Sequence, residues 1–317
     1  MSMRSIFVGV LSTALVFGAL SAVSGGASAA EGVVIAPGRI PSAARATLLA
    51  EIDSARQSNP AVFVAVATVR SQVAELDANK RGRLAAITPF LKSIGPEALF
   101  PMLAELAVDA PARGDLTDTA WAAWRIGLLE AVGSIRDPRS EGVLIAILES
   151  PETDFAVVKA AAEALGKVGS DRAAAKLVLF AKAAGPKQTA ILAGMGECRR
   201  TVTTDALAKA LAANPDAATA RLVIRSLGNA GSAWAWKTPI IQVSGEEAAV
   251  RRAAAKALVR AFVAYEGEAR KAAEKSILVV DDASTPALIE AAKKSASPAL
   301  AAELDALAAR FAKSPIR

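Results

Sequence analysis

One type of segment recurs along the middle of the chain at a nearly constant spacing, and this recurrence limits the possible folds more than any other feature. Each copy contains an apolar helical run, and four of the five end in glycine at the aligned position. The aligned positions are separated by 33, 30, 32 and 31 residues: Gly133, Gly166, Gly196, Gly228 and Val259. Such a period is typical of proteins built from stacked copies of one small unit. The sequence therefore predicts an array.

Each copy reads as two helices joined by a polar turn. Apolar residues recur at helical spacing, as in Val250, Ala253, Ala254, Ala257 and Leu258. A helix of this kind offers one apolar stripe, which is buried only when the helix packs against its neighbours. Aromatic residues make up 4% of the chain and strong helix formers dominate, so we expect no large sheet.

The segment Val250–Leu258 resembles the second helix of a HEAT repeat, and Val157–Gly169 is similar. The period is shorter than the usual HEAT length of about 40–47 residues, and it is similar to the short HEAT-like repeats of phycobilin lyase subunits. The resemblance covers residues 120–262 and implies an all-α fold, an α-solenoid of stacked antiparallel helix pairs in a HEAT-like or armadillo-like superhelix. Ankyrin repeats are disfavoured because the chain has no histidine, and tetratricopeptide repeats because Tyr265 is the only tyrosine.

Residues 1–30 have the three-part layout of a secretory signal peptide: Arg4, an apolar run over 6–20, and small residues up to Ala30. We expect cleavage after Ala29 or Ala30 and export to the periplasm or the exterior of a bacterial cell. An uncleaved membrane anchor is the alternative, because no charge lies between Ser5 and Ala30. The short apolar core argues against it, since a spanning helix needs about 20 apolar residues.

The expected organisation follows from stop signals such as Asn59-Pro60 and from the loop rich in Asp, Pro and Gly after the first helices. Helices are expected over 44–57, 61–77 and 98–106, and a terminal pair over 285–294 and 298–311. We divide the chain into a signal peptide (1–30), a linker (31–43), N-terminal helices with a degenerate repeat (44–108), a loop (109–118), HEAT-like repeats (119–284) and C-terminal capping helices (285–317).

The side chains that most enzymes use are scarce in this sequence. Without histidine the chain lacks the commonest general base and metal ligand. Cys198 is the only cysteine, so no internal disulfide forms, and its place in the repeat predicts a buried core residue. The pair Asp281-Asp282 favours the start of a helix over a metal site. We therefore predict no catalytic residue, no cofactor and no metal.

Two of the four tryptophans lie in an irregular stretch. Trp124 takes the place of core residues in other repeats and is expected to be buried. Trp234 and Trp236 lie within residues 232–245, where Pro239 interrupts the helical pattern and Ile240–Val243 look more extended. Irregular insertions in repeat arrays often carry a binding surface, so both are candidate partner-binding residues. For at least one of them, packing over a distorted repeat is the favoured account.

When the outward-facing positions of the second helices are aligned from repeat to repeat, basic residues occupy them in the later repeats. We call this predicted row of cations the basic ladder. Its members are Arg221, Arg225, Arg252 and Lys256. They place like charges four residues apart, a mildly unfavourable arrangement that an anionic partner would relieve. The alternative is a solvated face whose charge is compensated by carboxylates of the first helices.

These observations favour a non-enzymatic scaffold that binds a protein partner or an anionic glycan on its concave face. The mild net charge of +6 gives no reason to expect nucleic acid. No stable membrane insertion is expected once the signal is removed. A structural subunit of an envelope assembly is the alternative, and the family resemblance leaves a lyase-like enzyme as a third hypothesis.

Overall fold

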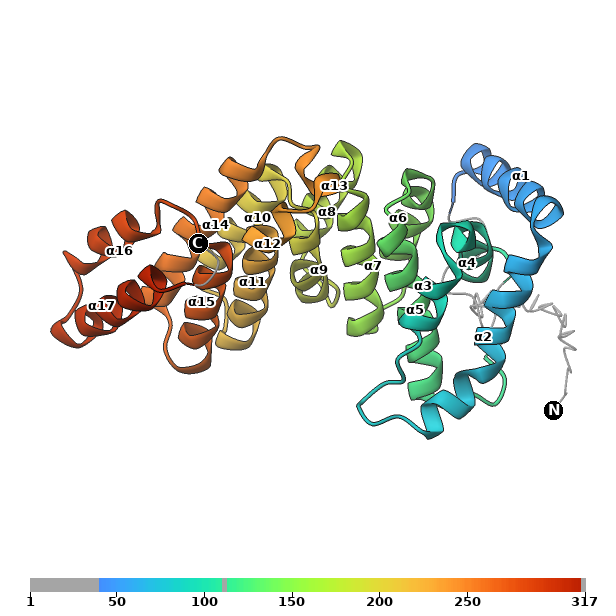
Figure 1. Cartoon of the computed structure of the whole chain (residues 1–317), viewed down its shortest axis with the longest axis horizontal. Coiled ribbons are helices and arrows are strands. Elements are labelled where there is room, and N and C mark those ends of the chain that lie inside the picture. Colours follow the sequence, from blue (N-terminus) through green and yellow to red (C-terminus); the bar gives the residue numbers. More distant parts are fainter. Residues whose placement is uncertain (1–39, 110–112, 315–317) are drawn as a thin grey trace, which may run out of the picture.

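The fold is built from helices alone in the part of the chain that the structure, a computed structural model, describes: residues 40–109 and 113–314. Helices follow one another as a stack along one long axis, from the N-terminal helices to the C-terminal pair (Figure 1). The predicted all-α solenoid is confirmed. The expected signal peptide (1–30) and most of the linker lie outside the described residues.

The N-terminal helices are α1 (Ser42–Ser58), α2 (Pro60–Ala78), α3 (Thr88–Ile94), the 3₁₀ helix η1 (Pro96–Ala98) and α4 (Leu99–Ala107). The helices expected over 44–57, 61–77 and 98–106 correspond to α1, α2 and α4, each to within about two residues. Pro60 is the first residue of α2, where its missing N–H breaks no helical hydrogen bond.

The middle of the stack alternates between the two helices of each pair. It contains α5 (Asp118–Ile135), η2 (Pro138–Ser140), α6 (Glu141–Glu149), α7 (Phe155–Val168), α8 (Asp171–Lys182), α9 (Gln188–Gly194), η3 (Met195–Glu197), α10 (Thr201–Ala212) and α11 (Ala217–Ala230). The C-terminal part contains α12 (Ala233–Trp236), α13 (Pro239–Gln242), α14 (Glu247–Ala264), α15 (Gly267–Val280), α16 (Thr285–Lys293) and α17 (Pro298–Ala312).

Short polar residues set the ends of these helices. The Asp154 carboxylate accepts hydrogen bonds from the backbone N–H of Ala156 and Val157 at the start of α7, both at 2.9 Å. Ser170 caps α8 in the same way. Side-chain acceptors of this kind satisfy N–H groups that have no partner within the helix. At the other end of α7, Gly169 takes a left-handed conformation (φ 69°) that stops the helix.

The helices form two parallel rows. Row A contains α4, α6, α8, α10, α14 and α16, and row B contains α5, α7, α9 with η3, α11, α15 and α17; each helix packs on its neighbours within its row and on the other row. One apolar cluster runs between the rows from the first helices to the last. Burial is therefore contributed pair by pair, as in other stacked repeats.

Row B is drawn together by the glycines of the recurring segment. A Cβ atom at Gly133 of α5 would lie 2.7 Å from Ala164 Cα of α7, and one at Gly166 would lie 2.8 Å from the backbone nitrogen of Cys198. Glycine is the residue that permits such close backbone approach. A Cβ atom at Gly196 would meet the Ser226 carbonyl of α11, and one at Gly228 would meet the Ser276 side chain of α15. The four glycines thus mark four successive contacts of one row.

Val259, the fifth aligned position, does not continue this row. It belongs to α14, which packs beside α10 in row A, whereas the row B neighbour of α11 is α15. The constant period predicted from the sequence is wrong at this point. The reason is the insert, residues 231–246, which holds α12 and α13 and displaces the next helix pair along the chain.

Residues 240–243 are not extended, as the sequence analysis expected. Pro239 is the first residue of the short helix α13, which runs to Gln242. Proline fits the first turn of a helix, where its fixed φ is favourable and its missing N–H costs nothing. The β-branched residues that follow have no strand to pair with among the described residues, so their strand preference is overridden.

Candidate functional site

The four predicted cations lie on two different rows. Arg221 and Arg225 are on α11 in row B, whereas Arg252 and Lys256 are on α14 in row A. The continuous ladder expected from the sequence is therefore wrong. The prediction assumed that α11 and α14 are the same member of two successive helix pairs. The insert between them makes α14 the row A member of its pair instead.

On row B Arg221 shares the field of one carboxylate, that of Glu268, with two lysines. Arg221 acts on Glu268 of the next helix, α15: Lys271, which donates a hydrogen bond, and then Arg221 and Lys275 lower the pKa of the Glu268 carboxyl. The i,i+4 pair Lys159–Glu163 on α7 is an ion pair, at 2.5 Å. Around this pair row B has the mixed surface that was the alternative to a binding site.

Arg252 faces a different environment from Lys256. It lines a surface cavity of about 710 Å³ where α14 approaches the loop between α15 and α16. Three carboxylates, those of Glu247, Asp281 and Asp282, share this cavity with the guanidinium groups of Arg251 and Arg252. The carboxylates outnumber the cations, so Arg252 contributes no excess positive field there.

Lys256 lines a groove between α10 and α14, the two row A helices on either side of the insert. The groove has a volume of about 590 Å³. Its walls are mostly alanine methyl groups, which leave space between the helix axes: Ala208 and Ala212 from α10, and Ala253, Ala257, Ala261 and Ala264 from α14. Leu211 forms the buried floor.

Three cations and one carboxylate line this groove. Lys209 extends from α10, Lys256 and Arg260 extend from α14, and Asp205 is the acidic residue. All four are exposed, and within residues 40–109 and 113–314 none of the three cations makes an ion pair. Lys256 and Arg260 stand at i and i+4, where like charges cost about 0.2–0.5 kcal/mol in an isolated helix. The groove therefore carries uncompensated positive charge.

One end of the groove is fixed by a contact between the rows. Tyr265, directly after α14, donates a hydrogen bond from its hydroxyl to the Pro215 carbonyl at 3.2 Å. Asn214, the residue before Pro215, has a left-handed backbone (φ 52°), which asparagine tolerates better than most residues. The end wall is thus built into the turn between α10 and α11.

The sequence prediction missed Lys209 and Arg260 because it compared equivalent positions only among the helices that it took as the second member of each pair. Lys209 was never compared with Lys256, since their helices were assigned to different members of the pair. The signal that could have found them is the Pro- and Gly-containing insert, which indicates a break in phase between α11 and α14.

The two tryptophans of the insert have opposite environments. Trp236 is 1% exposed, and its indole Nε1–H donates to the Ala230 carbonyl at 2.9 Å. It packs with Ala230 and Val250 in a small second core. Trp236 is therefore the tryptophan with the packing role that was favoured for at least one of the two, and its candidacy as a partner-binding residue is wrong. Trp234 is 59% exposed, with Lys237 Nζ 4.1 Å from its ring centroid. Trp124 is buried, as predicted.

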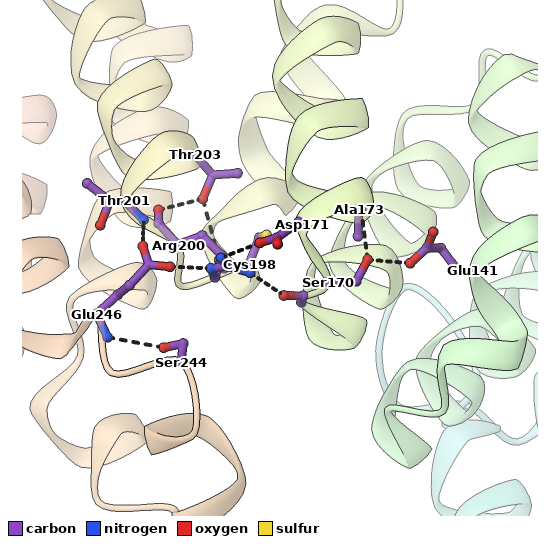
Figure 2. A network of polar contacts seen from close by, with 11 residues as sticks. Glu141, Ser170, Asp171, Ala173, Cys198, Arg200, Thr201, Thr203, Ser244 and Glu246 are labelled. Atoms are coloured by element: carbon purple, nitrogen blue, oxygen red, sulfur yellow. Dashed lines mark hydrogen bonds and ion pairs between the residues drawn. The ribbon is translucent and has the colours of Figure 1, made fainter.

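Arg200 ties the end of the insert to the stack (Figure 2). Its Nε lies 2.5 Å from a Glu246 oxygen, and its Nη2 lies 2.5 Å from Asp171 at the start of α8. Its Nη1 donates to the Gly169 carbonyl at 2.9 Å. Arg200 thereby satisfies a carbonyl beyond the C-terminus of α7 and fixes the insert with the same guanidinium group.

Glu246 completes this network. It accepts a hydrogen bond from the Thr201 backbone N–H at 2.6 Å, at the first residue of α10. Burial acts to raise the pKa of the Glu246 carboxyl, but the bonds from Thr201 and Arg200 outweigh it and lower that pKa. The carboxylate therefore stays ionised and helps to start α10. Both functions are structural.

Cys198 is buried beside this network, as predicted. Its side chain is 1% exposed, and burial raises the pKa of the thiol to about 12. A reactive cysteine is a thiolate near neutral pH. Cys198 stays protonated under those conditions and serves as a small apolar core residue.

The acidic pair after α15 has conformational roles. Asp281 takes a left-handed conformation (φ 45°) that ends α15. Asp282 accepts a hydrogen bond from the Ser284 backbone N–H at 2.9 Å, just before α16. Across the described residues no group of three or more His, Cys, Asp or Glu side chains is placed to hold a metal ion.

Within the part of the chain that the structure describes, no helix combines the length and the apolar character that crossing a lipid bilayer requires. A model of HEAT repeats matches residues 116–193, the segment from just before α5 to the end of α9. No curated protein matches the chain. The groove lies outside the matched segment, in later copies of the same helix pair. The family match shows that residues 116–193 are similar to HEAT repeats, and the stacked pairs show an all-α solenoid over the described residues.

Proposed function

We propose that this protein is an exported, non-enzymatic scaffold of a bacterial cell envelope or exterior, and that it binds a protein partner through row A. The observation that carries the proposal is the α10–α14 groove, in which three cations that make no ion pair with any described residue surround an alanine-lined space. HEAT repeats are stacking units whose extended surfaces suit protein binding. Charged surfaces without internal partners favour association with a complementary surface.

Export is supported by the layout of residues 1–30. N-terminal sequencing of material recovered from the envelope should find a mature chain that begins near Ala30 or Glu31. A mature product that still contains Arg4 would contradict cleavage and favour an N-terminal anchor.

The binding function is tested with the mature chain as bait in extracts of envelope fractions. A partner should be retained at low salt and released as the ionic strength approaches about 1 M, where charges are screened beyond about 3 Å. The size of the native particle checks the alternative of a structural subunit. A mature chain found only in a large, salt-resistant assembly would contradict the scaffold proposal.

A further inference from the structure

The length of the groove suits a short segment of a polypeptide. The stretch from Asp205 to Ala212 lines it along α10, and at 1.5 Å per residue this is about 10 Å of helix. That length accommodates about two turns of a helix or about three residues of an extended strand. The site is thus matched to a short segment of a partner.

The charges of the groove are placed on both of its walls. Lys209 reaches it from α10, and Lys256 and Arg260 reach it from α14. A segment lying between the helices would therefore meet cations on both sides, and carboxylates are the groups that pair with them. Asp205, the acidic lining residue, leaves an excess of positive charge.

The floor and walls distinguish between classes of anionic ligand. Alanine methyl groups, Leu211 and the ring of Tyr265 supply most of the contact surface. A sugar chain needs hydrogen-bonding groups for its hydroxyls, and a methyl-lined wall leaves those hydroxyls without partners. A peptide segment with small apolar side chains between its acidic residues fits both the walls and the charges.

We infer that the α10–α14 groove binds a short acidic segment of a protein partner, whose carboxylates pair with Lys209, Lys256 and Arg260 while its apolar side chains lie on the alanine walls. This inference rests on the proposed scaffold function and goes further by naming the surface and the chemistry of the partner. Arg225 and Trp234, on other surfaces, are not part of it.

The experiment places a photo-crosslinking amino acid, benzoylphenylalanine, at Ala212 in the groove of the full chain in the cells that produce it. Ala212 is exposed and lines the groove. A second chain carries the probe at Asn229, which is exposed on α11 in row B. After irradiation, mass spectrometry identifies the crosslinked segment. The expected result is a crosslink from Ala212 to a segment rich in Asp and Glu, with none from Asn229 to that segment.

Two matched variants distinguish ion pairing within the groove from an effect of the net charge of the whole protein. The variant Lys209→Gln/Lys256→Gln/Arg260→Gln should lose the Ala212 crosslink. The control Arg225→Gln/Lys271→Gln/Lys275→Gln removes the same number of positive charges from row B and should keep it. With the identified segment as a synthetic peptide, the groove variant should bind at least about tenfold more weakly, with a flatter salt dependence. Circular dichroism establishes that both variants are folded.

Several outcomes would overturn the inference. A crosslinked segment without carboxylates, an adduct with the mass of a glycan or lipid, or a crosslink unaffected by the groove variant would each reject it. If Asn229 alone crosslinks to a partner, the scaffold function survives and the groove is not its site. If neither position crosslinks to any protein, the inference and the proposed function both fail.

Discussion

At the scale of single residues, the glycines of row B are required because the neighbouring helices leave no room for a Cβ atom, and not because the backbone there needs to be flexible. Alanine is usually the better helix former, by about 1 kcal/mol. Gly166→Ala should nevertheless lower the free energy of unfolding by about 1–3 kcal/mol, because its Cβ would lie 2.8 Å from the Cys198 backbone nitrogen. Denaturant titration followed by circular dichroism measures this change.

Gly142 provides the matched control. It lies in α6, and a Cβ atom there would meet nothing within 4 Å. Gly142→Ala should leave the stability unchanged or raise it by up to about 1 kcal/mol. If Gly166→Ala is equally harmless, the helices of row B have room to separate, and close approach does not explain its glycines.

Glu105 of α4 makes the stability depend on pH. Burial raises the pKa of its carboxyl to about 7, although Arg70 acts to lower it and Asp109 adds to the increase. Its Oε2 atom is buried, with no hydrogen-bond partner among the described residues. Between the ordinary value of 4.5 and about 7 the folded chain holds a proton that the unfolded chain has lost. Stability due to this group therefore falls as pH rises through that window.

Replacing this carboxyl tests the sign. Glu105→Gln should be more stable than the natural chain at pH 8, by about 1 kcal/mol once solvent screening of a partly exposed group is allowed for. The difference should shrink as the pH falls toward 5. Thermal unfolding at both values measures it, and a constant difference would show that the effect is one of packing.

At the scale of elements, the insert depends on one of its two tryptophans. Trp236→Ala should cost about 3–5 kcal/mol, because it empties the core shared with Ala230 and Val250 and removes the bond to the Ala230 carbonyl. Trp234→Ala should change the stability by no more than about 0.5 kcal/mol, since that ring is exposed. Equal losses in the two variants would show that Trp234 is also a core residue.

The helices themselves were predictable from the sequence because their signals are local. The predicted break at Asn59-Pro60 lies where the structure ends α1 and begins α2. The caps that the structure adds, Asp154 and Ser170, are signals of the same local kind. The row to which α14 belongs was not predictable from its pattern. Its apolar stripe suits either row, and only packing against α10 and α15 decides between them.

The basic character of the candidate site was predictable from the sequence, but only one of its three cations was. A basic surface in the later repeats was expected, and Lys256 belongs to the groove. Lys209 and Arg260 come together with it through contacts between helices far apart in sequence. A fixed repeat length does not identify such contacts after residues 231–246, because the insert shifts the following helices relative to the earlier repeats.

At the scale of the whole molecule, the last two helices close the stack. Ile289, Leu304, Leu307 and Phe311 are buried, and Arg270 of α15 pairs with Glu303 of α17 at 2.7 Å. Truncation after Asp282 removes this cover and should leave a helical protein that aggregates, because α14 and α15 then expose apolar surface.

Size-exclusion chromatography and circular dichroism measure both effects. A chain truncated after Lys313 keeps α16 and α17 and serves as the control. If the shorter chain is monodisperse and as stable as the control, the terminal helices are an appendage and the stack ends at α15.

The unequal spacing of the two rows gives the stack a mechanical property. The helices of row B meet at glycines that leave no room for a Cβ atom, whereas α10 and α14 of row A, which are in contact, leave an alanine-lined groove along their seam. Row A therefore has space for an occupant where row B has none. An occupant that enters between α10 and α14 should move these two helices apart and rotate the N-terminal and C-terminal parts of the stack relative to each other. Small-angle X-ray scattering should then show a changed maximum dimension when a bound segment fills that space.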